Sequence, residues 1–223
     1  MIRRYNEVQL EENYNKFIAI VEKYFTGERL EKLLHMYSME ELGPNLMLSP
    51  ASGNISYHNA YEGGYIDHVF NVCKNSLRMM KTFEDAGAKL DFTQEELLFA
   101  ALHHDLGKLG EKGKMNYVEN PSDWHVKNQG KVYTPNPDLS YMTHTDRTFF
   151  TLNLYGIQYN EKEYFGIKLT DGMYDEDNEK YLKSYNPDVA KRILKTPMYH
   201  ILHFADSMSS MIERQNEESR NQF

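Results

Sequence analysis

Apolar residues recur at three- and four-residue steps along almost the whole chain, whereas alternating, strand-like runs are scarce. A first helix is predicted over residues 7–24 from the spacing of Val8, Leu10, Tyr14, Phe17, Ile18, Val21 and Tyr24. A second helix is expected over residues 28–37, after Gly27, so residues 1–38 should form an N-terminal helical hairpin. A helical period this widespread predicts an all-α fold.

Two interior segments are expected to form the centre of the core. Residues 64–85 carry a single apolar stripe, which consists of Ile66, Val69, Phe70, Cys73, Leu77 and Met80. A following helix should begin at a capping box formed by Thr93 and Glu96 and end at Gly107. Its run 97–102 is apolar on nearly every side, which is typical of a fully buried helix.

Proline and glycine residues interrupt the helical pattern in two long stretches. Residues 39–64 are expected to form an ordered loop, and residues 110–140 an irregular but ordered flap. Long ordered loops often carry binding and catalytic residues, so both stretches are candidate parts of a functional site.

Shorter helices are expected in the second half of the chain. They are predicted over residues 146–155 and 160–169, and a final helix opens at Pro197 and gives way to a polar tail over 214–223. No repeat or linker marks a boundary, so residues 1–223 are expected to form one domain with its core over 65–213.

Composition restricts the setting and the partners of the chain. A single cysteine, Cys73, cannot form an internal disulfide, and no N-terminal stretch resembles a secretory signal, so a cytoplasmic location is expected. The longest apolar runs, such as 97–102, are far shorter than the roughly 20 residues that span a bilayer, so no membrane partner is expected. A formal charge of −8 disfavours broad binding to a nucleic-acid backbone and favours small anionic substrates or short single strands.

Four residues form the strongest candidate for a chemical site. His68, the adjacent pair His104 and Asp105, and Asp206 lie on three separate predicted helices. Imidazole and carboxylate groups are ligands for Mn²⁺, Fe²⁺, Co²⁺, Ni²⁺ or Zn²⁺. Adjacent residues point about 100° apart on a helix, so the pair can share one ion only at a helix end or where helices cross, and Gly107 supplies such an end. A lone His68 on an apolar face would be read as a hydrogen-bonded core residue; the other three residues favour a metal site.

The motifs around these residues resemble the HD superfamily of metal-dependent phosphohydrolases. Residues 101–108 read ALHHDLGK, and a later HFAD ends at Asp206. The stretch 49–68, SPASGNISYHNAYEGGYIDH, is similar to the lead-in of the HD domain of 3′–5′ exoribonucleases and of related phage and bacterial HD proteins. The resemblance covers roughly residues 50–213. It implies an all-α bundle with a metal at a helix junction, ligated by His68, His104, Asp105 and Asp206.

The resemblance also bears on a second ion. Bimetallic relatives carry two further histidines between the doublet and the last aspartate. His144 fits the first of these, but the segment of the second reads IKLTDGMYD, with Thr170 in place of the histidine. One tightly held ion is therefore expected, and Asp171 remains a candidate for binding a weaker one.

Four further side chains are candidates for contact with a phosphate or a base. Lys108 and Arg147 are expected to balance charge on a phosphoryl group, and His144 to protonate the leaving oxygen. His58 is a candidate pocket residue. Trp124 is expected either to stack on a base or to anchor the flap to the core.

Three functions remain open from the sequence. The leading one is a metal-dependent phosphohydrolase that attacks a nucleotide or small phosphate ester with a metal-activated water. A second is a 3′–5′ exonuclease or phosphodiesterase on short single strands or cyclic dinucleotides, which the lead-in favours and the net charge disfavours. A third is a non-catalytic nucleotide-binding HD module, for which Thr170 is the main support.

Overall fold

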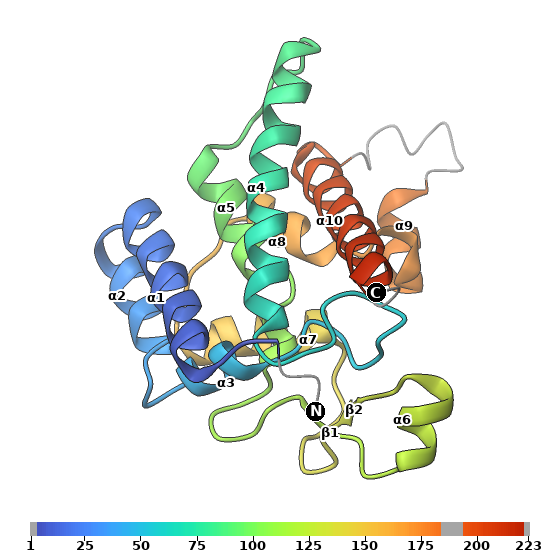
Figure 1. Ribbon diagram of the computed structural model, residues 1–223. Helices are drawn as coiled ribbons and strands as arrows, with labels where there is room; N and C mark the ends of the chain where they lie inside the picture. The colour runs from blue at the N-terminus through green and yellow to red at the C-terminus, as the bar shows by residue number, and fades with distance from the viewer. Residues whose placement is uncertain (1–3, 184–193, 221–223) are drawn as a thin grey trace.

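The structure is a computed structural model that describes residues 4–183 and 194–220, and it confirms the all-α prediction (Figure 1). Residues 1–3, 184–193 and 221–223 lie outside this description. The longer helices are α1 (Glu7–Tyr24), α2 (Gly27–Met36), α4 (Gly64–Asp85), α5 (Gln94–His103), α7 (His144–Leu154), α8 (Glu161–Lys168) and α10 (Met198–Arg220). The shorter elements are α3 (Gly43–Leu48), η1 (Leu106–Leu109), β1 (Tyr117–Glu119), α6 (Asp123–Gln129), β2 (Tyr133–Pro135), η2 (Gly172–Tyr174), η3 (Glu176–Asn178) and α9 (Glu179–Leu182).

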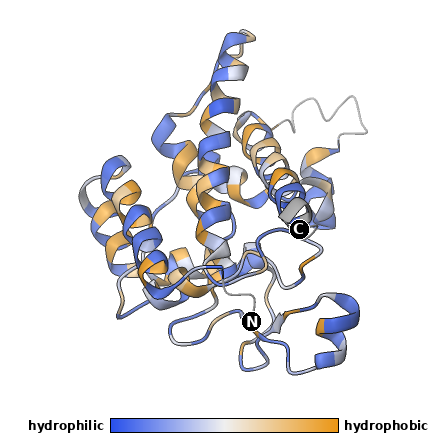
Figure 2. Ribbon diagram, viewed as in Figure 1, coloured by the Kyte–Doolittle hydropathy of each residue, from blue (hydrophilic) through white to orange (hydrophobic). Residues whose placement is uncertain are grey.

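Helix α5 is the centre of the core, as its apolar run indicates. Every residue from 97 to 102 is buried, and the run reads as orange in Figure 2, where α5 lies behind α4. The predicted capping box is present, because the Thr93 hydroxyl accepts from the Glu96 backbone while the Glu96 carboxylate accepts from the Thr93 backbone. Helices α4 and α8 pack against α5, and α10 packs along α4.

The N-terminal hairpin forms as predicted and covers one side of the molecule (Figure 1). An Asn6 capping box starts α1, and α1 contacts α2, α3 and α4. The buried side chains of this layer are Leu10, Phe17, Val21, Phe25, Leu33, Met36 and Tyr37. None of the helices in the described residues combines the length and apolar character that crossing a membrane requires.

The two stretches expected to be loops contain regular structure. Within 39–64, Pro44 lies in the first turn of α3, a position where its missing N–H is not needed, so it starts a helix there instead of breaking one. Within 110–140, β1 and β2 pair antiparallel with Val118 opposite Thr134, and α6 lies between them.

Backbone hydrogen bonds join the two stretches to each other. The Tyr133 N–H donates to the Gly53 carbonyl at 3.0 Å, and the Ile55 N–H donates to the Gly130 carbonyl at 2.9 Å. Backbone hydrogen bonds therefore connect the loop before α4 to the β1–β2 hairpin, and both segments line one cavity.

The ends of two helices differ from prediction. Helix α5 ends at His103 instead of near Gly107, and His104 and Asp105 occupy the turn into η1. Helix α10 continues to Arg220, so residues 214–220 of the expected polar tail are helical. Two acidic side chains at this end have partners on other elements: Glu213 contacts His68, and Glu217 accepts from the Asn59 backbone N–H. Composition alone does not reveal such contacts, so it does not predict that the helix continues here.

Gly107 allows η1 and α7 to approach closely. A β-carbon at this position would overlap the carbonyl oxygen of His144 and come within 3.0 Å of the Arg147 β-carbon. Both are backbone or near-backbone atoms, so they cannot move aside as the tip of a flexible side chain could.

We expect Gly107→Ala to destabilise the protein by more than about 2 kcal/mol, because it forces η1 away from α7. Gly113→Ala is the matched control: its φ of +72° strains an alanine, but nothing lies within 4 Å of the new methyl group, so its cost should stay near 1 kcal/mol. Chemical denaturation of both variants measures the difference. Equal losses would contradict the close approach.

Candidate metal centre

Three elements bring the four predicted ligands together. His68 comes from α4, His104 and Asp105 from the turn after α5, and Asp206 from α10. The Nε2 atom of His68 lies 3.3 Å from the Nε2 atom of His104, 3.6 Å from Asp105 Oδ2 and 3.1 Å from Asp206 Oδ1. His104 Nε2 lies 3.4 Å from Asp105 Oδ2 and 3.8 Å from Asp206 Oδ1. His68, His104 and Asp105 are buried, and Asp206 is partly exposed.

These separations fit the coordination sphere of one ion. Ligands about 2.1 Å from a metal lie about 3.0 Å apart at a 90° angle and about 3.4 Å apart at a tetrahedral angle. The five separations lie near this range, between 3.1 and 3.8 Å. The buried group of His68, His104 and Asp105 could therefore hold a metal ion, with the Asp206 carboxylate beside both imidazoles.

Hydrogen bonds on the far side of each imidazole fix its orientation. The Nδ1 atom of His68 lies 3.0 Å from Glu213 Oε2, and the Nδ1 atom of His104 lies 2.8 Å from the Ala101 carbonyl oxygen. Each Nδ1–H can donate to its oxygen partner, so Nε2, which faces the other ligands, is the atom that would bind a metal ion after losing its proton. Such partners set the tautomer and raise the basicity of a metal-binding histidine.

Glu213 is the functional candidate that the sequence reading missed. It is buried, and its second oxygen accepts from the Asn71 amide at 2.7 Å. The available signal was its position seven residues after Asp206, two helical turns further along the same face of α10.

The charges at the centre are strongly coupled. Burial acts to lower the pKa of His68, but its hydrogen bonds to Asp206 and Glu213 raise it to about 10. Burial acts to raise the pKa of Asp105, but Lys108 and the two histidines hold it well below its usual range. The carboxylates therefore carry negative charge in a buried site, which suits a cation.

Lys108 lies directly beside the proposed ligands. Its ammonium group is 2.6 Å from Asp105 Oδ2, the same oxygen that faces the two histidines. Despite burial, the Asp105 carboxylate raises the pKa of Lys108 above its ordinary value, so the side chain stays charged.

Two cavities open onto this centre. One, of about 560 Å³, also contacts Asp206 and Arg214, and the other, of about 540 Å³, extends to the β1–β2 hairpin and His144. Both cavities are lined by Tyr57, His58, Asp105, Lys108 and Asp171. A substrate in either one would reach Asp105 and Lys108.

The remaining candidate histidines lie at the cavity walls. The His58 ring centroid is 4.5 Å from that of His68, and its buried Nε2 has no hydrogen-bond partner among the described residues. Burial, with His68 and Lys108, lowers the pKa of His58 to about 2. His144 Nε2 lies 3.4 Å from the Asn116 amide, and burial and Lys108 lower its pKa to about 4. Both rings are therefore neutral at neutral pH.

Arg147 and Trp124 have surroundings that differ from those expected. Arg147 is 2% exposed, pairs with Glu111 and donates to the Ser140 carbonyl, so it fastens the 110–140 segment to α7. Trp124 is 59% exposed on α6. Neither residue lines the two cavities at the metal centre.

Thr170 and Asp171 lie in the first of these cavities. The Thr170 hydroxyl donates to the Gly166 carbonyl at 2.7 Å, and its own carbonyl lies 2.6 Å from His203 Nδ1. Among the described residues, two groups could hold a metal ion: His68 with His104 and Asp105, and His68 with His58 and Glu213. Thr170 and Asp171 belong to neither group.

No protein-family model, curated protein or solved structure matches this chain. Membership of the HD superfamily therefore stays a prediction from the motifs.

We expect the protein to bind about one equivalent of Mn²⁺ or Co²⁺ through these ligands, because the candidate groups share His68. Calorimetric titration gives the stoichiometry, and anomalous scattering from crystals gives the position. Two fully occupied ions about 3.5 to 4 Å apart would contradict the expectation.

We expect Glu213→Gln to weaken metal binding by about 10- to 100-fold, because the amide orients His68 less strongly than the carboxylate does. Competition with a chelator measures the change. Glu31→Gln, an identical replacement at an exposed position of α2, is the control and should bind metal as the wild type does. An unchanged affinity in Glu213→Gln would remove Glu213 from the metal centre.

Proposed function

We propose that this protein is a metal-dependent phosphohydrolase that acts on a nucleotide or another small phosphate ester. The observation that supports this proposal most directly is the convergence of two imidazoles and two carboxylates beside a partly buried lysine and two open cavities. The nitrogen and oxygen donors suit Mn²⁺, Fe²⁺, Co²⁺, Ni²⁺ or Zn²⁺.

His68, His104, Asp105 and Asp206 would hold the ion. When bound, a divalent ion at this place supplies Lewis acidity toward a water molecule and a phosphate oxygen. The backbone carbonyl of Ala101 and the carboxylate of Glu213 keep both imidazoles directed at that position.

Lys108 is the group best placed to bind the phosphate. Its ammonium faces both cavities and keeps its charge beside Asp105. A point charge within reach of a phosphoryl oxygen stabilises the negative charge that develops during hydrolysis. Arg147 pairs with Glu111 and lines neither cavity, so we assign the phosphate contact to Lys108, which lines both.

His58 and His144 can serve as hydrogen-bonding groups for the substrate. Their low pKa values keep both imidazoles neutral, so each offers one N–H donor and one acceptor at neutral pH. This supports a positioning role for His144 in preference to protonation of the leaving oxygen, because a group with a pKa of about 4 seldom carries the required proton at neutral pH.

The size of the site favours a small substrate. Each cavity is in the range that holds one small molecule, and the chain carries a net charge of −8. A single nucleotide satisfies both conditions better than a long strand. Cyclic dinucleotides and short single strands are the alternatives within the same chemistry, and binding without turnover is the alternative outside it.

We expect the purified protein to hydrolyse at least one compound from a panel of nucleotides, cyclic dinucleotides and short oligonucleotides when Mn²⁺ is present. Activity should disappear on chelation and in Asp105→Ala, which removes a ligand without opening a large core cavity. Release of phosphate or nucleoside measures turnover. Binding without turnover of any panel member would favour the non-catalytic alternative.

Lys108→Met should lower kcat/KM by about 10²- to 10³-fold, because it removes the charge that faces the phosphate. Lys112→Met is the matched control, since Lys112 is 59% exposed on its side chain and pairs with Glu41 outside the cavities. Equal activity of the two variants would contradict the role of Lys108.

A further inference from the structure

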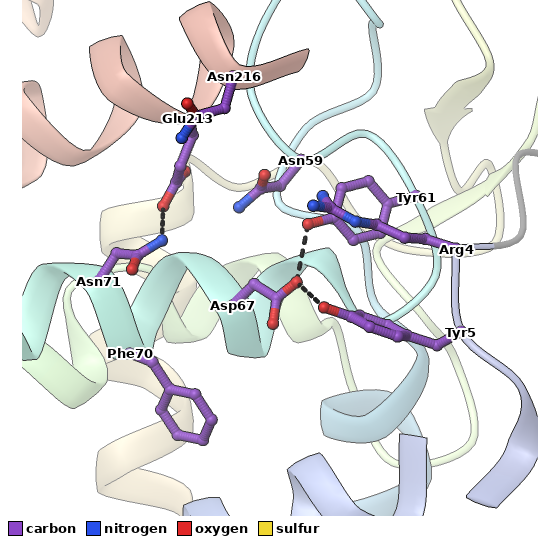
Figure 3. Close-up of a pocket in the computed structure, with 9 residues that line it drawn as sticks. All are labelled: Arg4, Tyr5, Asn59, Tyr61, Asp67, Phe70, Asn71, Glu213 and Asn216. Atoms are coloured by element: carbon purple, nitrogen blue, oxygen red, sulfur yellow. Dashed lines mark hydrogen bonds between the residues drawn. The ribbon is translucent and has the colours of Figure 1, made fainter. Parts of the chain in front are cut away.

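A third cavity lies beside Glu213, between α4 and α10 (Figure 3). It has a volume of about 240 Å³ and is bordered by the N-terminal segment, the loop before α4, α4 itself and α10. It shares no lining residue with the two cavities at the metal centre. Glu213 belongs to its wall, and the same carboxylate contacts His68.

Asn59 presents an unsatisfied donor to this cavity. The residue is 3% exposed, and its side-chain Nδ2 is buried without a hydrogen-bond partner among the described residues. Figure 3 shows this nitrogen directed into the space between Glu213 and Asp67. A buried amide N–H nearly always donates to an acceptor, but the described residues provide none for Asn59 Nδ2.

The backbone holds Asn59 in this position. Its φ is +47°, a left-handed conformation that asparagine adopts more readily than most residues, and its N–H donates to Glu217 Oε1 at 3.0 Å. The side chain is therefore presented from a fixed turn.

The acidic groups of the wall already have partners. One Asp67 oxygen accepts from the Tyr5 hydroxyl at 2.6 Å and from the Tyr61 hydroxyl at 2.8 Å. The Glu213 carboxylate contacts His68 and Asn71. Both carboxylates of the wall are therefore already hydrogen-bonded to neighbouring side chains.

Amides and aromatic rings supply the rest of the wall. Asn71 uses its NH₂ group toward Glu213, which leaves its carbonyl oxygen as an acceptor, and Asn216 adds a third amide at an exposed position. Tyr5, Tyr61 and Phe70 are the aromatic members. The Arg4 guanidinium lies 4.6 Å from the centroid of the Tyr61 ring.

We propose that this cavity binds a nucleobase, either free or as a nucleoside, with Asn59 donating to a ring nitrogen or carbonyl oxygen. Amide side chains match the adjacent donors and acceptors on the edge of a base, and a neutral planar ligand avoids the penalty of burying another charge. The volume restricts the ligand to about the size of a base or nucleoside. This proposal does not rest on the proposed hydrolysis, because the cavity shares no lining residue with the two cavities beside Asp105 and Lys108.

The experiment measures binding of the free bases and nucleosides to the full-length chain by calorimetry. Asn59→Asp replaces the unpaired donor by an acceptor and keeps a residue that tolerates the left-handed backbone. Asn153→Asp makes the same change at an exposed position on α7 and is the control. Asn216→Trp fills the mouth of the cavity from an exposed helix position, so it tests the site even if Asn59→Asp fails to fold.

We expect one base or nucleoside to bind with one-to-one stoichiometry. Its dissociation constant should rise by about tenfold or more in Asn59→Asp, which corresponds to the loss of one buried hydrogen bond. It should rise by a similar factor in Asn216→Trp, because the indole fills the mouth of the cavity. Asn153→Asp should bind as the wild type does. Absence of binding by every base and nucleoside at millimolar concentration overturns the proposal. Binding that neither cavity variant changes, or binding of free amino acids in place of bases, overturns it as well.

Discussion

The contact between His68 and Glu213 ties the two longest helices together at the place where chemistry is proposed. Asp206 and Glu213 stand two turns apart on α10, and the imidazole of His68 reaches both of them from α4. The packing of α10 along α4 therefore sets the direction of the ring, and the turn after α5 supplies the remaining ligands against it. A shift of α10 by one turn would separate both carboxylates from the imidazole.

The centre concentrates charge where a core normally has none. Asp105 and Glu213 are buried and Lys108 is partly buried, and each lies within hydrogen-bond distance of another charged or ionisable group. Burial of such groups is unfavourable unless their charges are balanced, and a divalent ion would balance the carboxylates. A chain selected only for stability would place apolar side chains here. The retained charges are consistent with a site maintained for binding.

Local patterns accounted for the helices and singled out four residues that the fold brings together, whereas contacts between distant segments did not follow from them. The Thr93 capping box and the apolar run of α5 depend on neighbouring residues, so the sequence alone predicts them. Glu213 gains its role only from His68, 145 residues away, and Arg147 is engaged by Glu111. A positively charged residue near a predicted site does not reveal which acidic residue will pair with it. Pro44 shows a similar limit, because its effect depends on whether a helix starts there.

The pairing of the loop at residues 53–55 with the β1–β2 hairpin has a kinetic consequence. The loop continues into Tyr57 and His58, while the hairpin contributes Tyr133 and Thr134 to the same cavity. Because backbone hydrogen bonds connect the two, displacement of the hairpin would carry the aromatic and imidazole side chains of the loop with it. Entry and exit of a ligand would then follow one concerted movement with a single rate, in place of separate fluctuations of two independent loops.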